Sequence, residues 1–222
     1  MIEVSGVRRS FGTGATATEA LRGVDLRAAP GAIVALFGRS GSGKTTLLNL
    51  VGGLDRPDVG TIDVGGVQVD QLDPEGAATW RRSNLGIVHQ SHGLLPWLTT
   101  QDNVELPLRL LRMRRPERRE RARARLAALG LADRVAHLPD ELSGGQQRRV
   151  AIARALVTEA RVLLADEPTA GLDEDTARVV FGLLRDEAHE TGRTVLLTSH
   201  DPLAREVADE VIELRDGRRL ED

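Results

Sequence analysis

The stretch GRSGSGKTT, residues 38–46, combines three glycines with the only lysine of a chain that carries 30 basic residues. Gly38, Gly43, Lys44 and Thr45 fit the pattern G-x-x-x-x-G-K-[ST], whose glycines let backbone N–H groups turn toward phosphate oxygens. The lysine brings a compact ammonium to the phosphates, and the threonine offers a hydroxyl to Mg²⁺. We therefore predict a phosphate-binding loop. Its candidate residues are Gly38, Arg39, Ser40, Gly41, Ser42, Gly43, Lys44, Thr45 and Thr46.

The survival of one lysine among so many arginines also favours this interpretation. Arginine presents a wide planar fork, whereas lysine presents a small ammonium on a thin stem. A loop that wraps tightly around phosphate has room only for the second, so we expect Lys44 to resist replacement by arginine.

Two carboxylates follow the apolar run RVLLAD, in the stretch RVLLADEP of residues 161–168. Open α/β sheets bind ligands at the carboxyl ends of their strands. We expect Asp166 to hold Mg²⁺, and Glu167 to point to the other side of the strand and polarise an attacking water. The alternative is that both residues merely solvate a strand end.

A second possible anion site lies in the stretch ELSGGQQRRV, residues 141–150. Ser143 is predicted to cap a helix that runs through QQRRVAIARALV, and two glycines follow it. The N-terminus of a helix attracts anions. One chain would then have two anion sites.

The elements that must position these residues alternate in type, which predicts an α/β fold with a parallel sheet. A helical insertion at about 100–158 interrupts the alternation, and Pro116 is expected to open a helix within it. The segment 11–20 is rich in Gly, Ala and Thr and is predicted to be a loop. The expected strands are 2–7, 21–28, 32–38, two short strands around a Gly-Gly turn in 60–69, 85–90, and apolar runs starting near 161, 194 and 210; the expected helices include one after Lys44 that stops at Gly52-Gly53 and one near 174–190.

Composition excludes several classes of protein. The 222 residues are 41% apolar, the net charge is −3, and there is no cysteine. Disulfides and thiolate metal sites are therefore excluded, and the charge gives no sign of nucleic acid as a partner. The sequence offers neither a long apolar span nor a signal-peptide core, so we expect a cytoplasmic protein.

Residues 112–126 hold eight arginines and two glutamates. The favoured interpretation is a solvated helix face, with support from Glu117–Arg121 and Glu120–Arg123 pairs. Contact with anionic lipid or nucleic acid is the alternative. The spacing of His89, His92, His137 and His189 does not suggest a metal site, and we interpret these histidines as structural.

The stretch LSGGQ, residues 142–146, is the signature of the ABC ATPases, and the whole chain resembles that family. Gln90 follows a strand as in the family's Q-loop, AGLD at 170–173 resembles its D-loop, and His200 follows TVLLTS as in its H-loop. Phe11 stands where the family's aromatic residue stacks on adenine. The resemblance implies ATP and Mg²⁺ as ligands, with Thr45, Gln90 and Asp166 around the metal. It implies catalytic roles for Lys44, Gln90, Glu167 and His200.

The resemblance also implies a head-to-tail dimer, in which the signature of one subunit closes over ATP held by Lys44 of the other. The implied fold is α/β: a P-loop NTPase core with an N-terminal antiparallel β subdomain and an inserted α-helical signature subdomain. The expected single domain, 1–222, divides into core segments 1–95 and 159–222 and a helical subdomain 96–158. The residues expected to reach the partner's nucleotide are Ser143, Gly144, Gly145, Gln146 and Asp173.

Within the family, the chain resembles the lipoprotein-release and macrolide-export group in LLNLVGGLDRPDVGTI and in the segment that follows Gln90. It departs from that group at AGLD, where GNLD is usual, and at Arg39. The resemblance implies a transmembrane permease that contacts residues 91–103, and a location on the cytoplasmic face of a bacterial membrane. A mechanotransmission or cell-division ATPase that moves no substrate is an alternative, and a soluble DNA-repair ATPase is a more distant one.

Overall fold

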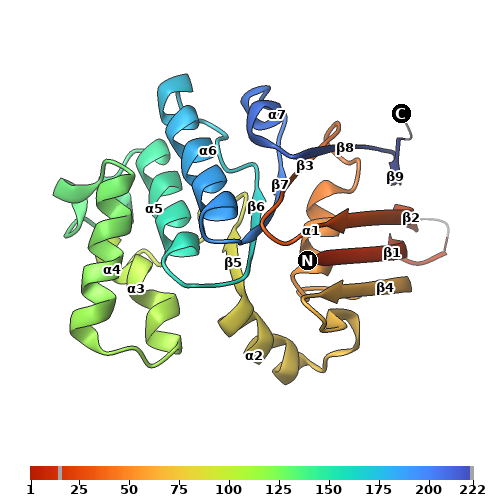
Figure 1. Cartoon of the computed structure of the whole chain (residues 1–222), viewed down its shortest axis with the longest axis horizontal. Helices are drawn as coiled ribbons and strands as arrows, with labels where there is room; N and C mark the ends of the chain where they lie inside the picture. Colours follow the sequence, from red (N-terminus) through yellow and green to blue (C-terminus); the bar gives the residue numbers. More distant parts are fainter. Residues whose placement is uncertain (15–16, 221–222) are drawn as a thin grey trace.

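The computed structural model describes residues 1–14 and 17–220, and it begins with a small antiparallel sheet. Strands β1 (Ile2–Phe11), β2 (Thr18–Ala28) and β4 (Val59–Val64) form this sheet in the order β2-β1-β4. In its register, Val4 lies opposite Leu26 on one side and Ile62 on the other, and all three side chains are buried. The apolar positions of the three strands therefore face one core (Figure 1).

The second sheet runs through the centre of the molecule in the order β5-β6-β7-β3-β8-β9, and all its ladders are parallel except the last. Its strands are β3 (Ile33–Phe37), β5 (Leu85–Val88), β6 (Val162–Asp166), β7 (Thr194–Thr198), β8 (Glu210–Arg215) and β9 (Arg218–Arg219). Every residue of β3, β6 and β7 is buried, as expected of parallel strands covered on both faces.

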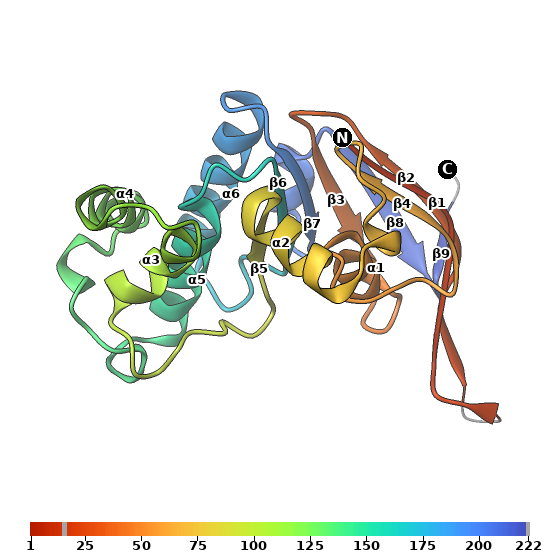
Figure 2. The same cartoon turned by 90° about the horizontal axis from the view of Figure 1, so that it is seen from below.

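Alternate residues of β3 show what covers each face. Ile33, Ala35 and Phe37 join a core with apolar residues of α5 (Gly144–Leu156) and α6 (Glu174–His189). Val34 and Leu36 join a second core with α1 (Lys44–Val51) and the antiparallel sheet. The central sheet thus lies between helices on one side and a helix backed by the small sheet on the other (Figures 1 and 2).

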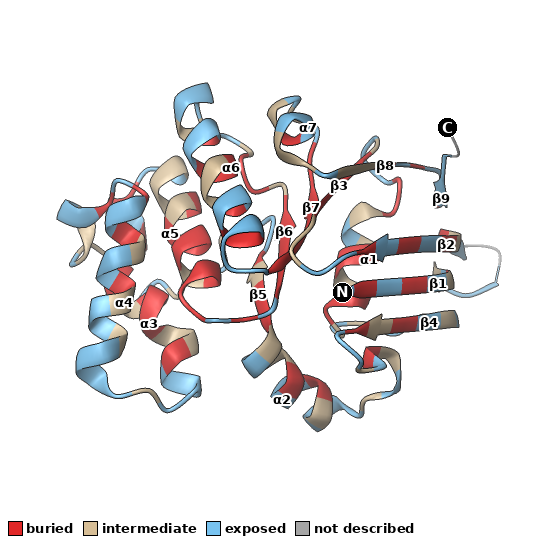
Figure 3. Cartoon of the chain, in the orientation of Figure 1, coloured by how far each residue is buried: buried red, intermediate tan, exposed pale blue. Residues whose placement is uncertain are grey.

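Three helices pack together on one side of the molecule: α3 (Thr100–Leu110), α4 (Arg115–Ala128) and α5. Thr99 caps α3, Pro116 lies in the first turn of α4, and Ser143 caps α5, as predicted for the last two. The outer face of α4 is largely exposed (Figure 3). The proposed limits of this helical subdomain, 96 and 158, stay a prediction.

The arginine-rich segment is tied into the helical region by ion pairs. Arg118 Nε lies 2.8 Å from the buried carboxylate of Glu105, and Arg121 pairs with Glu117 at 3.0 Å as predicted. Arg123, however, donates to Gln101 Oε1 at 2.9 Å, and no Glu120–Arg123 pair occurs in the part of the chain that the structure describes. These contacts favour a structural role for much of the segment.

Two local predictions were wrong. The loop expected over 11–20 is wrong at both ends, because β1 continues to Phe11 and β2 begins at Thr18; these two strand ends project from the molecule in Figure 2. Residues 15–16 of the expected loop lie outside the described residues. The second strand expected in 60–69 reduces to a single bridge between Asp63 and Gln68. The second strand does not form because the Asp70 carboxylate accepts a hydrogen bond from the Ile62 N–H at 2.9 Å and so takes the place of a strand partner.

The chain also contains short helices that connect these layers. Helix α2 (Pro74–Asn84) was not predicted, although its signals are present: Asp73 accepts a hydrogen bond from the Gly76 N–H, and Pro74 occupies the first helical position. The other connections are η2 (Val69–Gln71), η3 (Ala132–Arg134), η4 (Pro139–Glu141) and α7 (Leu203–Val207). No helix among the described residues combines the length and the apolar character that crossing a membrane requires.

Candidate active site

The glycines of the loop between β3 and α1 are required by close packing. A Cβ on Gly38 would lie 2.2 Å from the Leu214 carbonyl oxygen, and one on Gly43 would lie 2.6 Å from the Ala20 carbonyl oxygen. Gly43 also has φ of +102°, which strains any other residue. The loop is therefore wedged between β2 and β8 in a conformation that only glycine adopts at these points.

Lys44 closes this loop from inside. Its Nζ donates to the carbonyl oxygens of Gly38 at 2.7 Å and Arg39 at 3.1 Å. Among the described residues, no side chain caps the N-terminus of α1, and the buried Ser42 hydroxyl has no hydrogen-bond partner. Unpaired donors at a helix N-terminus beside an ammonium fit the oxygens of a phosphate group.

Asp166, the last residue of β6, lies against two hydroxyl groups. Thr45 Oγ1 donates to its Oδ2 at 2.9 Å, and Thr198 Oγ1 donates to its Oδ1 at 2.6 Å. A hydroxyl and a carboxylate within hydrogen-bond distance are oxygen ligands of the kind that Mg²⁺ prefers. Thr45 and Asp166 therefore fit the metal role expected of them.

Glu167 has an unusual backbone, with φ of +50°. Its N–H donates to Thr198 Oγ1 at 3.0 Å, so the neighbouring strand β7 holds the turn. Its carboxylate is only 14% exposed and lies 2.8 Å from Nδ1 of the exposed His200. A non-glycine residue in this region of φ costs free energy, and such strain occurs preferentially at functional sites.

These groups share one cavity of about 660 Å³. The structure brings together there every residue predicted for the phosphate loop, together with Phe11, Gln90, Asp166, Glu167 and His200. Phe11 is 45% exposed, so its ring is not part of the core of the first sheet. Its ring faces the Arg9 guanidinium at 4.9 Å, and Arg9 is itself paired with Asp55 and Asp58.

The signature residues do not line this cavity. Ser143 Oγ accepts a hydrogen bond from the Gln146 N–H at 3.3 Å, and Gln146 Oε1 accepts one from the Ser143 N–H at 2.9 Å. Gly145 packs beside Leu172, and Gly144 is exposed. Asp173 caps α6, where hydrogen bonds from the Thr176 N–H and hydroxyl hold the pKa of the Asp173 carboxyl below its usual value. The five residues predicted to reach a partner's nucleotide thus lie apart from the cavity of their own chain.

Two of the other histidines lie in surroundings that disfavour their charged form. Burial lowers the pKa of His89 and of His92, and the Arg154 and Arg148 guanidinium groups, respectively, add to these shifts. Within the described ranges, 1–14 and 17–220, no group of three or more His, Cys, Asp or Glu side chains could hold a metal. The structural interpretation of His89, His92, His137 and His189 stays a prediction.

Some residues of the site were not predicted from the sequence. Thr198 connects Asp166 with the backbone of Glu167, while Ala20 and Ala170 line the cavity. A threonine at the end of an apolar run, TVLLT, was the only signal for the first of these. The two alanines carry no chemical signal at all.

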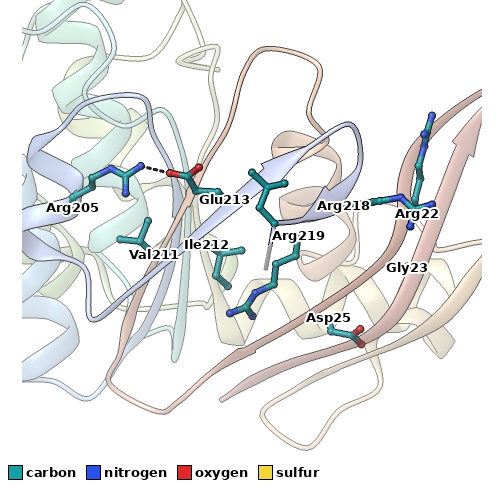
Figure 4. A pocket seen from close by; sticks show the side chains of 10 residues that line it. Arg22, Gly23, Asp25, Arg205, Val211, Ile212, Glu213, Arg218 and Arg219 are labelled. Atoms are coloured by element: carbon teal, nitrogen blue, oxygen red, sulfur yellow. Dashed lines mark hydrogen bonds and ion pairs between the residues drawn. The ribbon is translucent and has the colours of Figure 1, made fainter. Parts of the chain in front are cut away.

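A larger hollow, of about 860 Å³, lies elsewhere, among β2, β8, β9 and α7 (Figure 4). Its arginines are partly neutralised: Arg205 pairs with Glu213 at 2.5 Å, and Arg219 pairs with Glu210 at 3.2 Å. It has neither the glycine loop nor the helix N-terminus of the first cavity. We therefore place the chemistry in the smaller cavity.

A buried strand, a glycine loop closed by lysine, and a free helix N-terminus beside a hydroxyl–carboxylate pair define a P-loop nucleotide-binding protein. Residues 21–170 match the family described as ABC transporter. The chain therefore belongs to the ABC transporter family, and it is an ATP-binding, ATP-hydrolysing cassette of that family.

Named relatives and solved structures agree with this assignment. Over 222 residues the chain is 46% identical to the macrolide export ATP-binding/permease protein MacB of Hyphomonas neptunium and 44% identical to MacB 1 of Yersinia pestis bv. Antiqua. It is covered completely in both comparisons but spans only 34% of the length of each relative. A dimeric post-hydrolysis structure of the cassette MJ0796 bound to ADP and Pi is 37% identical, with a TM-score of 0.95, and the match covers 100% of this chain and 97% of that one. The structure thus confirms the predicted α/β cassette fold.

Proposed function

We propose that two copies of this chain close head to tail over two Mg–ATP and thereby drive a membrane permease. The observation that carries the proposal is the separation of the signature from the cavity: Ser143 lies outside the space that Lys44 lines. The two MJ0796 structures are described as dimeric, which supports pairing of this kind. Relatives named for macrolide export favour an export or lipoprotein-release role over a cassette that moves no substrate.

The geometry supports distinct roles for the residues of the cavity. Lys44 and the N–H groups of the loop bind the β- and γ-phosphates. Thr45, Gln90 and Asp166 hold Mg²⁺, which when bound offsets phosphate charge. Phe11 presents its exposed ring to the adenine base.

Glu167 and His200 act on the attacking water. The Glu167 carboxylate orients that water toward the terminal phosphorus and accepts its proton as the new P–O bond forms. The bond between that phosphorus and the bridging oxygen breaks in the same step, so ADP leaves and inorganic phosphate is released. His200 lies 2.8 Å away and holds the carboxylate in place. The partner's Ser143 and Gly145 supply hydrogen-bond donors to the same phosphate from the opposite side. Such fixed donors stabilise developing charge without reorganisation during the reaction.

The segment 91–103 is the proposed permease contact, and its apolar side chains divide into two groups. Leu94 is partly buried and packs against the core, so it serves the fold of the chain itself. Trp97 is 71% exposed, which is unusual for so large an apolar side chain and favours an interface. Such a contact would hold the chain at the cytoplasmic face of the membrane.

Substitution of Glu167 by glutamine tests the proposal. The amide keeps the shape of the carboxylate but cannot accept the proton, so we expect ATP to bind, turnover to fall by about 100-fold or more, and a dimer to accumulate. Size-exclusion chromatography with Mg–ATP measures the dimer. Glu159→Gln, at an exposed carboxylate that pairs with Arg121, is the matched control and should behave as wild type. A Glu167→Gln chain that stays monomeric and hydrolyses ATP normally would disprove the proposed role.

A further inference from the structure

Helix α5 reaches the edge of the active site as well as the dimer face. It begins at Ser143, and Arg148 lies on it little more than one turn further along. Arg148 is only 6% exposed, and its Nη1 donates to the His89 carbonyl oxygen at 3.2 Å. His89 immediately precedes Gln90, so this hydrogen bond fixes the backbone from which the proposed metal ligand extends.

Arg148 is a buried cation without an ion-pair partner in the described part of the chain. Burial lowers the pKa of the Arg148 guanidinium, whereas Asp166 and Glu167 raise it. Among the described residues, no carboxylate lies within ion-pair distance of this guanidinium, and its Nε has no hydrogen-bond partner. A buried arginine with a single hydrogen bond is costly to the fold, so packing alone gives little reason to keep it there.

A second arginine of the same helix holds the next part of the segment. Arg154 donates to the carbonyl oxygens of His92 at 2.8 Å and Gly93 at 2.6 Å. Three backbone carbonyls near Gln90, one before it and two after it, therefore accept hydrogen bonds from arginines of α5. These hydrogen bonds give α5 a direct mechanical connection to the backbone of Gln90.

We propose that Arg148 is a positioning residue for ATP hydrolysis: through its hydrogen bond to the His89 carbonyl oxygen it links the signature helix to Gln90 of the same chain. Closure of the signature on a partner's nucleotide would then adjust the chain's own site. The inference rests on the proposed roles of Gln90 and Glu167, and it assigns Arg148 a contribution to turnover rather than to nucleotide affinity.

Two substitutions of Arg148 test this inference in the full chain. Arg148→Met keeps the apolar stem without charge or donor, and we expect kcat to fall about tenfold or more while KM for ATP changes less than about threefold. Arg148→Lys restores the charge and one donor and should recover at least about a third of the lost rate. The control is Arg193→Met: Arg193 is also buried and donates to a backbone carbonyl, that of Thr158, but it lies at the opposite end of the sheet. This control should lower Tm and leave kcat within about twofold.

A double-mutant comparison separates positioning from general support of the fold. If Arg148 acts through Gln90, Arg148→Met should change kcat by less than about twofold in a Gln90→Ala background. Additive losses, a normal kcat in Arg148→Met, or a change in KM alone would overturn the inference. If Glu167→Gln is inactive and Arg148→Met is fully active, the role inferred for Arg148 is wrong and the proposed function stands. Normal turnover in Glu167→Gln rejects the proposed function, and this inference with it.

Discussion

Helices α1 and α5 both present an N-terminus that the sequence predicts to bind anions, yet the two termini differ in the structure. The first turn of α1 follows Gly43 at φ of +102° and has no side-chain cap among the described residues. The first turn of α5 is capped by Ser143, in a reciprocal pair of hydrogen bonds with Gln146. The N-terminus of α1 therefore keeps its backbone N–H groups free inside a cavity. At the N-terminus of α5, the Ser143 side chain already accepts a hydrogen bond from a backbone N–H group.

The difference shows why one chain holds two such sites. Around α1, the chain itself supplies the ammonium of Lys44, the buried hydroxyl of Ser42 and the neighbouring Asp166, so a single chain has the groups to bind the phosphates. Around α5, the donors are held in position by a capping box but face outward. We infer that α1 binds the phosphates first and that α5 adds its donors only when a second chain delivers a nucleotide.

Lys44→Arg should produce the largest loss. The ammonium lies inside the loop, on the carbonyl oxygens of Gly38 and Arg39. A planar guanidinium is too wide for that position, although it keeps the charge. We expect turnover to fall below about a thousandth of the wild-type rate, because phosphoryl transfer depends on positioned positive charge. A steady-state ATPase assay with confirmed folding measures this, and near-normal turnover would show that the loop does not need lysine.

Ser143→Ala should distinguish the role of the α5 N-terminus from that of the α1 N-terminus. Loss of the cap should cost about 1 kcal/mol of stability. ATP binding by the single chain should remain within about twofold of wild type, because Ser143 lies outside its cavity. ATP-dependent dimerisation should weaken by about tenfold or more, since each site loses one phosphate donor. Nucleotide titration at low protein concentration and sedimentation with Mg–ATP give the two values; equal losses in both would remove the distinction between the helices.

Phe11→Ala should have the smallest effect. Stacking of a base on an aromatic ring contributes about 1–3 kcal/mol and tolerates different bases. ATP and GTP should therefore weaken by similar factors, and wild type should discriminate between them by less than about tenfold. Because Phe11 is 45% exposed, Tm should change little. Competition binding of ATP against GTP, in wild type and in Phe11→Ala, measures these affinities. A hundredfold preference for ATP would show that a polar group reads the adenine edge.

The catalytic loop could be predicted from sequence because its chemistry is local. Glycines, lysine and threonine at fixed spacing after a buried strand specify the phosphate loop without knowledge of distant residues. The apolar run before Asp166 likewise places that carboxylate at the end of a strand. The capping of α5 by Ser143 followed from residue type alone.

The contacts that depend on sheet register could not be predicted. Thr198 reaches Asp166 because β6 and β7 pair in parallel with these two residues side by side. Arg148 meets His89 because α5 packs on β5, an arrangement that no local pattern specifies. The Asp70 carboxylate likewise accepts the Ile62 N–H that a second strand would have used, a side-chain contact that hydrophobic periodicity does not encode.

The central claim, that each ATP site combines Lys44 of one chain with Ser143 of another, is tested most directly by mixing two variants. Both carry Glu167→Gln to prevent turnover; one adds Lys44→Arg and the other Ser143→Glu, whose charge repels phosphate. Neither variant alone can form a complete site, but a mixed dimer contains one site with both Lys44 and Ser143 intact. Size-exclusion chromatography with Mg–ATP should therefore show dimers in the mixture and monomers in each separate sample. A mixture that remains monomeric while the Glu167→Gln parent dimerises would contradict the shared site.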